Sequence, residues 1–424
     1  MMAPPHRTAL TLLAALLLGG CAALPPPAAV LNYAGFSAPA TAAERPAFNA
    51  RVYDQAADWV ARRYYDDAFN GADWSAARAR HRPAALAAAS DTELYAALNA
   101  LLDELRDQHT HALSRREVEQ FRARRGVLLG FRTGPVADQT GPRRILAVFP
   151  VSPAALAGVQ PGWTLLATDG RPPGEVLGLG RLAEGQLVRC DFLDQSGGPR
   201  HLEIRARRLS YPPVRDARRL DGEVLLLAFD TFDLPAARWL RAELKRQPPV
   251  RGLILDLRNN TGGEARALAA ILAEIFPAQV DIGRIRSRGE SGLDARRSPH
   301  HSRAAHYSGP LAVLVSETSA SAAEILAAVV QHHRRGVVVG TATPGNVLIC
   351  VRWPLPGGGE LQLSVYDFIG PDGHRLEGRG IAPDLVIAPA PGATPDPQLE
   401  AALQALRPPP AAPPPTPASP RPAK

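Results

Sequence analysis

The feature that most constrains this chain is an alternation of strand-like and helical segments in its C-terminal half. Between residues 223 and 366, short apolar runs alternate with segments whose apolar residues recur at helical spacing. The predicted strands cover 224–229, 253–255, 311–315, 337–339, 347–351 and 361–366, and the predicted helices cover 235–245, 265–276 and 322–330. This order is typical of an α/β domain.

The composition indicates a globular protein with room for two or three domains. The chain has 424 residues, of which 46% are hydrophobic. Its net charge of +7 would by itself suit nucleic acid or an anionic membrane surface. The basic residues, however, are scattered among Asp and Glu, and no Lys/Arg run lies beside interleaved aromatic residues. We therefore expect no nucleic-acid partner.

Residues 1–20 are typical of an export signal. His6 and Arg7 precede an apolar run over residues 9–18, which is too short to span a bilayer and has the length of a signal-peptide core. The run leads into Leu-Gly-Gly-Cys, ending at Cys21, which resembles a bacterial lipobox. In a lipobox the cysteine is lipidated and becomes the first mature residue. The alternative is an ordinary signal peptide cut near Ala22.

Lipidation of Cys21 would anchor the chain to a membrane, because acyl chains bury methylene groups at about 0.8 kcal/mol each. We expect an exported bacterial lipoprotein of the cell envelope. Alanine, rather than aspartate, follows the cysteine, and this favours the periplasmic side of the outer membrane. Residues 21–46 are rich in Pro and Ala and are predicted to be a tether, and residues 393–424 are predicted to be a Pro-rich disordered tail.

Residues 47–120 are predicted to form a small helical domain. Val52, Ala56 and Val60 recur at helical spacing, and leucines recur in the same way at positions 94, 98 and 102.

Residues 121–209 resemble a PDZ domain at several places at once. The signals are short apolar runs at 127–129, 145–149 and 164–167, Ser-Pro-Ala-Ala at 152–155, Gly-x-x-Pro-Gly at 158–162 and Asp-Gly at 169–170. In a PDZ domain, backbone N–H groups of one loop hold a chain end, and the next strand pairs with an extended peptide. The loop that the resemblance implies consists of Gly126, Val127, Leu128, Leu129 and Gly130. The alternative is a generic small β domain.

A serine-rich segment lies between a predicted buried strand and a predicted helix. Residues 316–325 read Ser-Glu-Thr-Ser-Ala-Ser-Ala-Ala-Glu-Ile, so Ser321 would lie at the start of the helix. Free N–H groups and the helix dipole favour negative charge there, and the same donors could stabilise an oxyanion. Taken alone, however, Ser321 and Glu324 also fit a capping box, which requires no catalysis.

Further segments, in a fixed order around this serine, change that interpretation. Residues 256–263 end a strand with paired glycines, which let backbone come close to a ligand. Thr-Pro-Gly at 343–345 and the segment 371–384, which contains Glu-Gly-Arg-Gly-Ile-Ala-Pro-Asp, follow downstream. With the PDZ-like region, these segments resemble the C-terminal processing (tail-specific) protease family over most of residues 48–390. The resemblance implies a crotonase-like α/β protease core over 210–392, with a helical N-terminal domain and an inserted PDZ domain.

The family's nucleophilic serine maps onto Ser321. A serine hydroxyl needs a base, and the best-known branch of the family supplies a lysine. The matching position here is Asn346, which cannot accept a proton, and the only lysines in the chain are Lys245 and Lys424. Apart from these two lysines and the histidines, the basic residues are arginines, which stay protonated. A Ser-Lys dyad is therefore not expected.

A second branch of the family, which includes the tricorn-type proteases, uses serine, histidine and glutamate. Its histidine motif matches Asp-Gln-His-Thr at 107–110, with glutamine in place of glycine, and its glutamate motif matches Glu377. In such a site an imidazole takes the serine proton and a carboxylate orients the imidazole. The resemblance therefore implies Ser321, His109 and Glu377 as catalytic residues.

The histidine and the glutamate each have an alternative assignment. His111 lies two residues beyond His109 and could serve as the base, and His109 itself also suits a helix C-terminus. Glu377 could instead pair with Arg375 or Arg379 on the surface.

The remaining polar candidates concern the oxyanion, metals and disulfides. The implied oxyanion donors are the backbone N–H groups of Ala322, Gly262 and Gly263. No cofactor is expected. His300, His301 and His306 lie among Ser, Arg and Pro, which indicates a loop rather than a metal site. Cys190 and Cys350 could pair in an oxidising compartment, and the sequence leaves this open.

The sequence thus predicts a membrane-anchored serine endopeptidase. Its PDZ domain would hold an unstructured polypeptide, with the C-terminus as the candidate point of capture, and Ser321 would cleave it through an acyl-enzyme. One alternative is an inactive binding protein of the same fold, because Asn346 and Gln108 depart from the family's motifs. Another is a structural lipoprotein that uses its PDZ domain and Pro-rich tail for assembly.

Overall fold

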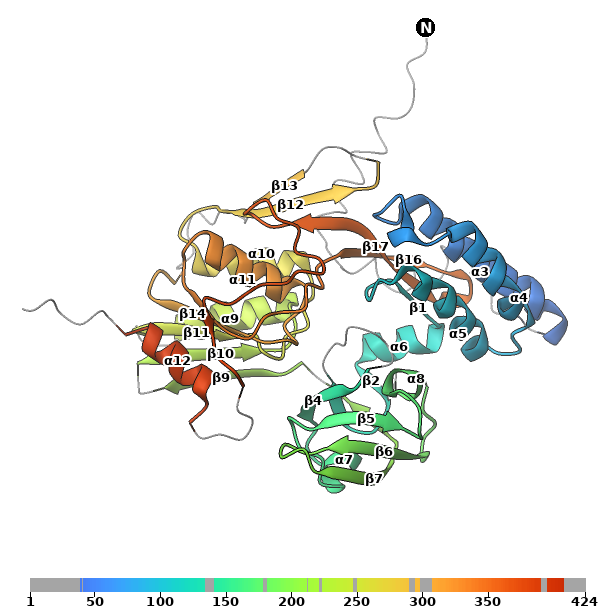
Figure 1. Cartoon of the computed structure of the whole chain (residues 1–424), viewed down its shortest axis with the longest axis horizontal. Coiled ribbons are helices and arrows are strands. Elements are labelled where there is room, and N and C mark those ends of the chain that lie inside the picture. The colour runs from blue at the N-terminus through green and yellow to red at the C-terminus, as the bar shows by residue number, and fades with distance from the viewer. Residues whose placement is uncertain are drawn as a thin grey trace, which may run out of the picture.

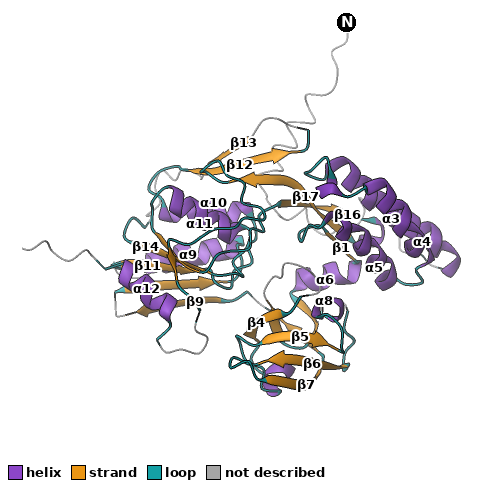
Figure 2. Cartoon of the chain, viewed as in Figure 1, coloured by secondary structure: helices purple, strands orange, loops and turns teal. Residues whose placement is uncertain are grey.

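The structure, a computed structural model, describes residues 39, 41–133, 141–177, 181–211, 213–220, 223–246, 250–289, 294–297, 307–389 and 395–407. These residues form a helical layer against an antiparallel sheet, a small β domain and an α/β core (Figure 1; by secondary structure in Figure 2). The predicted signal peptide with Cys21, most of the tether, the histidines at 300, 301 and 306, and the chain from residue 408 lie outside the described residues.

Three helices form the N-terminal layer, and the helical spacing at residues 52–60 and 94–102 lies in the first and third of them. They are α3 (Arg45–Arg63), α4 (Trp74–Ala87) and α5 (Asp91–Leu102), with 3-10 turns at Ala42–Glu44, Phe69–Gly71 and Asp103–Leu105. Side chains of Asp73 and Ser90 cap α4 and α5 by accepting backbone N–H groups of the first turn.

The helical layer shares its core with a five-stranded sheet, so the predicted helical domain is one face of a larger unit. The apolar side chains of α3 and α5 pack on Leu361 and Leu363, and Trp59 stacks on Trp353. The sheet has the order β1-β17-β12-β13, and β16 also pairs with β17. Its strands are β1 (His111–Leu113), β12 (Asp281–Ser287), β13 (Asp294–Arg297), β16 (Ile349–Pro354) and β17 (Glu360–Ile369).

Helix α6 (Arg115–Ala123) leads into the small β domain. Five antiparallel strands follow the order β3 (Phe131–Thr133), β4 (Arg143–Val148), β5 (Thr164–Thr168), β6 (Leu187–Leu193) and β7 (Pro199–Arg205). β2 (Arg125–Leu128) pairs with β8 (Arg207–Ser210) where the chain enters and leaves. Two short helices, α7 (Pro153–Leu156) and α8 (Pro173–Val176), complete the domain. Strand β3 is at the edge of the sheet.

The α/β core is a six-stranded sheet that is parallel except at one edge. Its order is β18 (Leu385–Val386), β15 (Val337–Gly340), β14 (Leu311–Val315), β11 (Gly252–Asp256), β10 (Val224–Phe229) and β9 (Arg215–Leu220), with only the β9–β10 pair antiparallel. Helices α9 (Leu234–Arg246), α10 (Ala265–Ile275) and α11 (Ala322–His332) cover one face. The predicted alternation of strands and helices over 224–340 is therefore confirmed.

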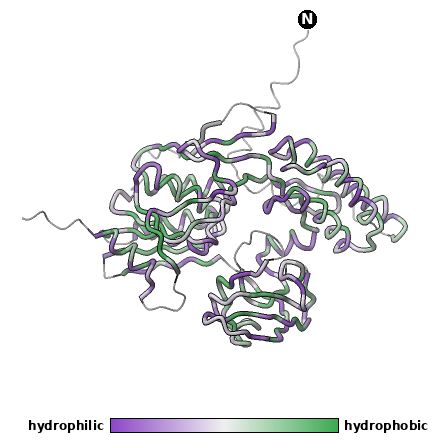
Figure 3. The backbone as a smooth tube through the Cα atoms, in the orientation of Figure 1, coloured by the Kyte–Doolittle hydropathy of each residue, from purple (hydrophilic) through white to green (hydrophobic). Residues whose placement is uncertain are grey.

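Alternate residues of the central strands serve two cores, one on each side of the sheet. Leu225 and Leu253 face the three helices, whereas Leu226 and Ile254 face the opposite side. Burial on both faces explains why these strands read as continuous apolar runs rather than alternating ones. Figure 3 shows this hydrophobic character along the strands of the core.

The C-terminal helix α12 (Pro397–Ala405) covers the second face and corrects one prediction. Residues 393–424 were predicted to be a disordered tail, yet Ala402 and Leu406 are buried in the core with Leu226 and Ile254. Asp396 caps the helix by accepting the N–H groups of Gln398 and Leu399. The prolines around the helix, Pro397 among them, hide it in the sequence, although proline is well tolerated at a first helical position.

Candidate active site

The strand-to-helix turn between β14 and α11 presents Ser321 at the start of the helix. Its backbone has φ 56° and ψ −117°, a left-handed conformation that is strained for a residue with a Cβ atom. A serine at such a strained turn, in front of the free N–H groups of a helix, is suited to nucleophilic attack. The predicted helix start at residue 322 is confirmed.

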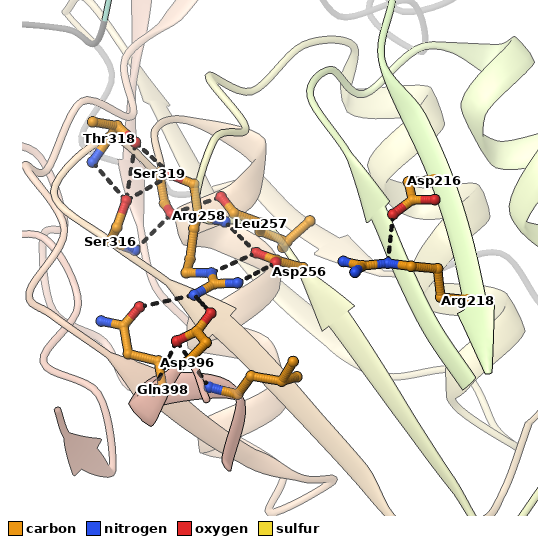
Figure 4. A network of polar contacts seen from close by, with 11 residues as sticks. Asp216, Arg218, Asp256, Leu257, Arg258, Ser316, Thr318, Ser319, Asp396 and Gln398 are labelled. Carbon is orange, nitrogen blue, oxygen red and sulfur yellow. Dashed lines mark hydrogen bonds and ion pairs between the residues drawn. The ribbon is translucent and has the colours of Figure 1, made fainter. Parts of the chain in front are cut away.

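Hydrogen bonds to the end of β11 hold the turn before Ser321. Ser319 Oγ donates to the Leu257 carbonyl at 2.8 Å, and Ser316 Oγ donates to the Arg258 carbonyl at 2.6 Å. The Thr318 hydroxyl also donates to the Arg258 carbonyl (Figure 4). The loop after β11 and the nucleophile turn are thus one hydrogen-bonded unit.

The side chain of Arg258 connects that unit to the C-terminal helix (Figure 4). Its guanidinium is paired with Asp256 at 2.6 Å and with Asp396 at 2.6 Å, and it donates to Gln398 at 3.2 Å. Asp396 and Gln398 belong to the start of α12, so this helix is tied to the same loop.

The paired glycines lie against the nucleophile, and their N–H groups differ in whether a protein acceptor binds them. Gly262 has φ +94°, and a Cβ there would lie 2.5 Å from Ser321 Cβ, so only glycine fits. The Gly262 N–H donates to Asn260 Oδ1 at 2.8 Å and is therefore occupied. Within the described ranges, the N–H groups of Gly263 and Ala322 donate to no protein acceptor. Of the predicted oxyanion donors, Ala322 and Gly263 remain and Gly262 does not.

His109 is half-buried in the segment between α5 and β1, and no hydrogen bond joins its imidazole to the nucleophile in the described structure. Its Nε2 atom has no hydrogen-bond partner in the described part of the chain. Burial lowers the pKa of His109, and nearby Asp107 opposes this shift. The imidazole is therefore neutral at neutral pH, as a general base must be.

The backbone around His109 is pinned in place. Asp107 accepts the His109 N–H at 2.7 Å and the Thr110 hydroxyl at 2.6 Å. Gln362 of β17 donates to the His109 carbonyl at 2.9 Å, and so the histidine motif is fixed to the central strand of the antiparallel sheet.

One ring nitrogen of His111, the alternative base, is within hydrogen-bonding distance of a backbone carbonyl. Its Nδ1 atom lies 3.0 Å from the His109 carbonyl. Burial, together with the charge of Arg352, lowers the pKa of His111 to about 4. This low basicity and this bond make His111 a poorer candidate than His109.

Glu377 binds backbone in this structure, and no hydrogen bond to His109 is present in the described part of the chain. Its Oε2 accepts the N–H groups of Val347 at 2.7 Å and Leu348 at 3.1 Å. Burial raises the pKa of Glu377 to about 7, and the charge of Asp107 adds to this rise. The predicted orienting bond to the imidazole is absent among the described residues, and Oε2 of Glu377 binds backbone N–H groups instead.

Asn346 and Gln108 bring the two ends of the site together. These residues depart from the family's motifs, and here the Asn346 amide donates to Gln108 Oε1 at 3.3 Å. Gln108 directly precedes His109, and the Asn346 N–H is bound by Glu324 of the nucleophile helix. Lys245 lies in the last turn of α9.

Glu324 has a larger role than sequence reasoning assigned to it. As the capping-box spacing predicts, its side chain accepts the Ser321 N–H, at 3.0 Å. It also accepts a hydroxyl and two further N–H groups from residues 343–346. The three-residue spacing from Ser321 was the available signal, and it could not show the partners from a distant loop.

The peptide-binding loop predicted in the small β domain is shorter than expected. Gly126, Val127 and Leu128 lie in β2 and pair with β8, because the entering and leaving strands close the base of the domain. Only Leu129 and Gly130 connect β2 to the edge strand β3.

Three other expectations concern metals, cysteines and membranes. The residues the structure describes contain no group of three or more His, Cys, Asp or Glu side chains able to hold a metal ion. Cys190 and Cys350 are both buried and free, so they do not pair with each other. None of the helices in the described ranges is both long and apolar enough to cross a bilayer.

Two parts of the chain match models of peptidase families. Residues 223–387 match peptidase family S41, and residues 47–103 match the tricorn protease C1 domain. The first match contains the strained serine, the glycine pair and Glu377, and the second covers the helices before the histidine motif. The α/β core is therefore similar to serine peptidase domains. More specifically, residues 223–387 are similar to peptidase family S41.

The chain is also similar to C-terminal processing proteases. It is 27% identical over 305 residues to a probable CtpA-like serine protease of Staphylococcus haemolyticus, covering 69% of this chain and 60% of that protein. It is 28% identical over 342 residues to the carboxyl-terminal-processing protease of Synechocystis, covering 76% of this chain and 77% of the relative. The chain therefore spans about 60% of the length of the CtpA-like proteases that it matches.

Solved structures share the fold. The photosystem II D1 C-terminal processing protease superposes with a TM-score of 0.60 at 22% identity, covering 80% of this chain and 93% of that chain. Mature CPAF gives a TM-score of 0.55 at 14% identity, covering 80% and 93%.

Proposed function

We propose that this chain is a serine endopeptidase that hydrolyses unstructured polypeptides through an acyl-enzyme on Ser321. The observation that carries the proposal is the strained Ser321 at the start of α11, next to the unoccupied N–H groups of Ala322 and Gly263 within an S41 domain. These donors would bind the oxyanion of the tetrahedral intermediate.

His109 is the proposed general base and Glu377 the residue that orients it. His109 has a depressed pKa and a buried Nε2 atom without a hydrogen-bond partner in the described part of the chain, and the charge of Asp107 acts on both His109 and Glu377. Catalysis requires His109 Nε2 to come within about 3 Å of Ser321 Oγ, so that the imidazole takes the hydroxyl proton and returns it to the leaving amine. Water then hydrolyses the ester.

The small β domain is proposed to act as a PDZ domain that captures the substrate. Its support is the edge strand β3, which can pair with an extended peptide, directly after the Leu129-Gly130 loop. A polypeptide C-terminus is the proposed point of capture. We also propose an exported lipoprotein anchored through Cys21 at the periplasmic face of the outer membrane, for which mass spectrometry of the mature N-terminus is the test.

The test of the function is a Ser321→Ala variant assayed on casein and with a fluorophosphonate probe. Wild type should cleave casein and take up the probe, and Ser321→Ala should do neither while keeping its circular dichroism spectrum. Ser196→Ala, at an exposed turn of the small β domain, is the matched control and should behave as wild type. Equal cleavage by wild type and Ser321→Ala would exclude Ser321 as the nucleophile.

A second candidate is an inactive binding protein of the same fold. It is favoured by one observation, the absence of a bond between His109 and Ser321 in the described structure. It predicts that wild type binds C-terminal peptides but takes up no probe.

A further inference from the structure

We propose that Glu324 is a positioning residue that fixes the nucleophile relative to the segment 343–348, in addition to capping α11. This inference rests on the proposed peptidase function, because it concerns the same serine. It identifies the contact through which a residue without access to substrate would control the reactivity of Ser321.

Glu324 is fully buried, and protein donors fill both of its carboxylate oxygens. Oε1 accepts the Thr343 hydroxyl at 2.6 Å and the Gly345 N–H at 2.6 Å. Oε2 accepts the Ser321 N–H at 3.0 Å and the Asn346 N–H at 2.8 Å. Capping α11 requires only the bond between Glu324 and the Ser321 N–H. The other three bonds of the Glu324 side chain therefore serve another purpose.

Four donors around one carboxylate match its ionised form. An ionised carboxylate is acceptor-only and has about four lone-pair sites, whereas a carboxylic acid would need an acceptor for its proton. Burial raises the pKa of Glu324, and the four hydrogen bonds oppose that shift. A neutral amide in its place would direct an NH₂ group at donors and lose their bonds.

The segment held by Glu324 is also held by Glu377. Four consecutive N–H groups are divided between the two carboxylates: those of residues 345 and 346 bind Glu324, and those of residues 347 and 348 bind Glu377. Thr343 connects this segment to the glutamate loop, since its hydroxyl accepts the Ile381 N–H at 2.8 Å. The positions of Ser321, Asn346 and Glu377 are therefore mutually dependent through Glu324.

The contact to Ser321 acts on its strained backbone. A φ of 56° is maintained only if the surroundings stabilise it, and the bond from the Ser321 N–H to Glu324 is one such restraint. A displacement of about 1 Å at a reacting atom can cost about 100-fold in rate. Loss of the Glu324 bonds should therefore reduce the chemical step and leave substrate binding unchanged.

The test compares Glu324→Gln with Thr343→Val and Thr343→Ser in the full chain. Glu324→Gln should lower kcat and the rate of fluorophosphonate labelling about 100-fold, with KM within about threefold of wild type. Thr343→Val removes one donor and should lower kcat about tenfold, whereas Thr343→Ser retains the hydroxyl and should restore most of the rate. Glu274→Gln controls for a buried amide, because Glu274 is 1% exposed and pairs with Arg241 in another part of the core.

The outcomes separate this inference from the proposed function. Wild type that neither cleaves nor labels overturns the peptidase proposal and this inference with it. Active wild type with Glu324→Gln and Thr343→Val at unchanged kcat overturns the positioning role alone. If Glu324→Gln does not fold, the Thr343 pair decides: a serine variant as slow as the valine variant overturns the inference, and rescue by serine supports it.

Discussion

The nucleophile and the base of the candidate site are held in contrasting ways. The turn that carries Ser321 is bonded to the loop after β11, to Glu324 and through Arg258 to α12. The backbone of His109 is held in place, yet its Nε2 atom is buried and has no hydrogen-bond partner among the residues that the structure describes. A buried polar atom without a partner is costly, and the base carries this cost.

Under the proposed function, this difference indicates which half of the site would have to change for catalysis. The serine, the glycine loop and the two N–H groups that donate to no acceptor in the described structure would bind an oxyanion without rearrangement. The imidazole, which makes no hydrogen bond to Ser321 in the described structure, would still have to approach the hydroxyl.

The largest expected effect is that of removing the imidazole. His109→Ala should lower kcat/KM at least about 10⁴-fold, because His109 is the proposed base for the serine proton. His111→Gln is the control and should stay within about tenfold of wild type, since an amide can still bind the His109 carbonyl. If His111→Gln is the variant that loses activity, the base has been misassigned. The measurement is peptide cleavage under first-order conditions.

The next largest effect is expected for Gly262→Ala, a change in the glycine loop that lies against the nucleophile turn. The added Cβ would lie 2.5 Å from Ser321 Cβ at a φ of +94°, and so the nucleophile turn must shift. We expect a loss of about 10³-fold in fluorophosphonate labelling, comparable to the loss of an oxyanion-hole donor. Gly71→Ala has a similar φ of +83° but open space around the added atom, and it controls for backbone strain alone. Equal labelling by wild type and Gly262→Ala would show that the turn is not rigid.

The smallest expected effect, about 100-fold in kcat, concerns Glu377→Gln and its pH dependence. The pKa of Glu377 is about 7, so kcat of wild type should rise as this group ionises around neutral pH. In Glu377→Gln this limb should move to the lower pH at which His109 titrates, since the pKa of His109 is depressed. A pH profile shared by the two proteins would restrict Glu377 to binding the backbone of residues 347 and 348.

The pH dependence of stability that Glu377 causes should have the opposite sign to the pH dependence of kcat. The folded chain holds the Glu377 proton more tightly than the unfolded chain does, because its folded pKa is raised. Stability should therefore fall as pH rises from about 4.3, the ordinary value, to about 7, and level off above that. Urea unfolding of Glu377→Gln should lack this decline.

The α/β core could be predicted from sequence because its physical signals are local. Strands buried on both faces leave continuous apolar runs, and the helices between them show helical spacing. The position of Ser321 followed in the same way, from a serine-rich segment between a strand and a helix. The helical layer was also predicted from spacing, although its shared core with β17 depends on a contact between distant parts of the chain.

The features that sequence could not supply depend on partners far away in the chain. Glu324 looked like an ordinary cap because Thr343 and Asn346 are brought to it only by the fold. Helix α12 was missed because prolines precede and follow it, and its buried Ala402 and Leu406 make a short apolar signal. The occupied N–H of Gly262 depends on the rotamer of Asn260, which no motif records.

The two-sided sheet has a practical consequence for where the chain can be shortened. The S41 match stops at residue 387, and a protein ended there would lack α12 and leave Leu226, Ile254 and their neighbours open to water. Burying one such side chain is worth about 1.5–3 kcal/mol, and a bare apolar sheet surface invites self-association. A minimal soluble fragment should therefore extend through Arg407, twenty residues beyond the limit that family resemblance alone would choose.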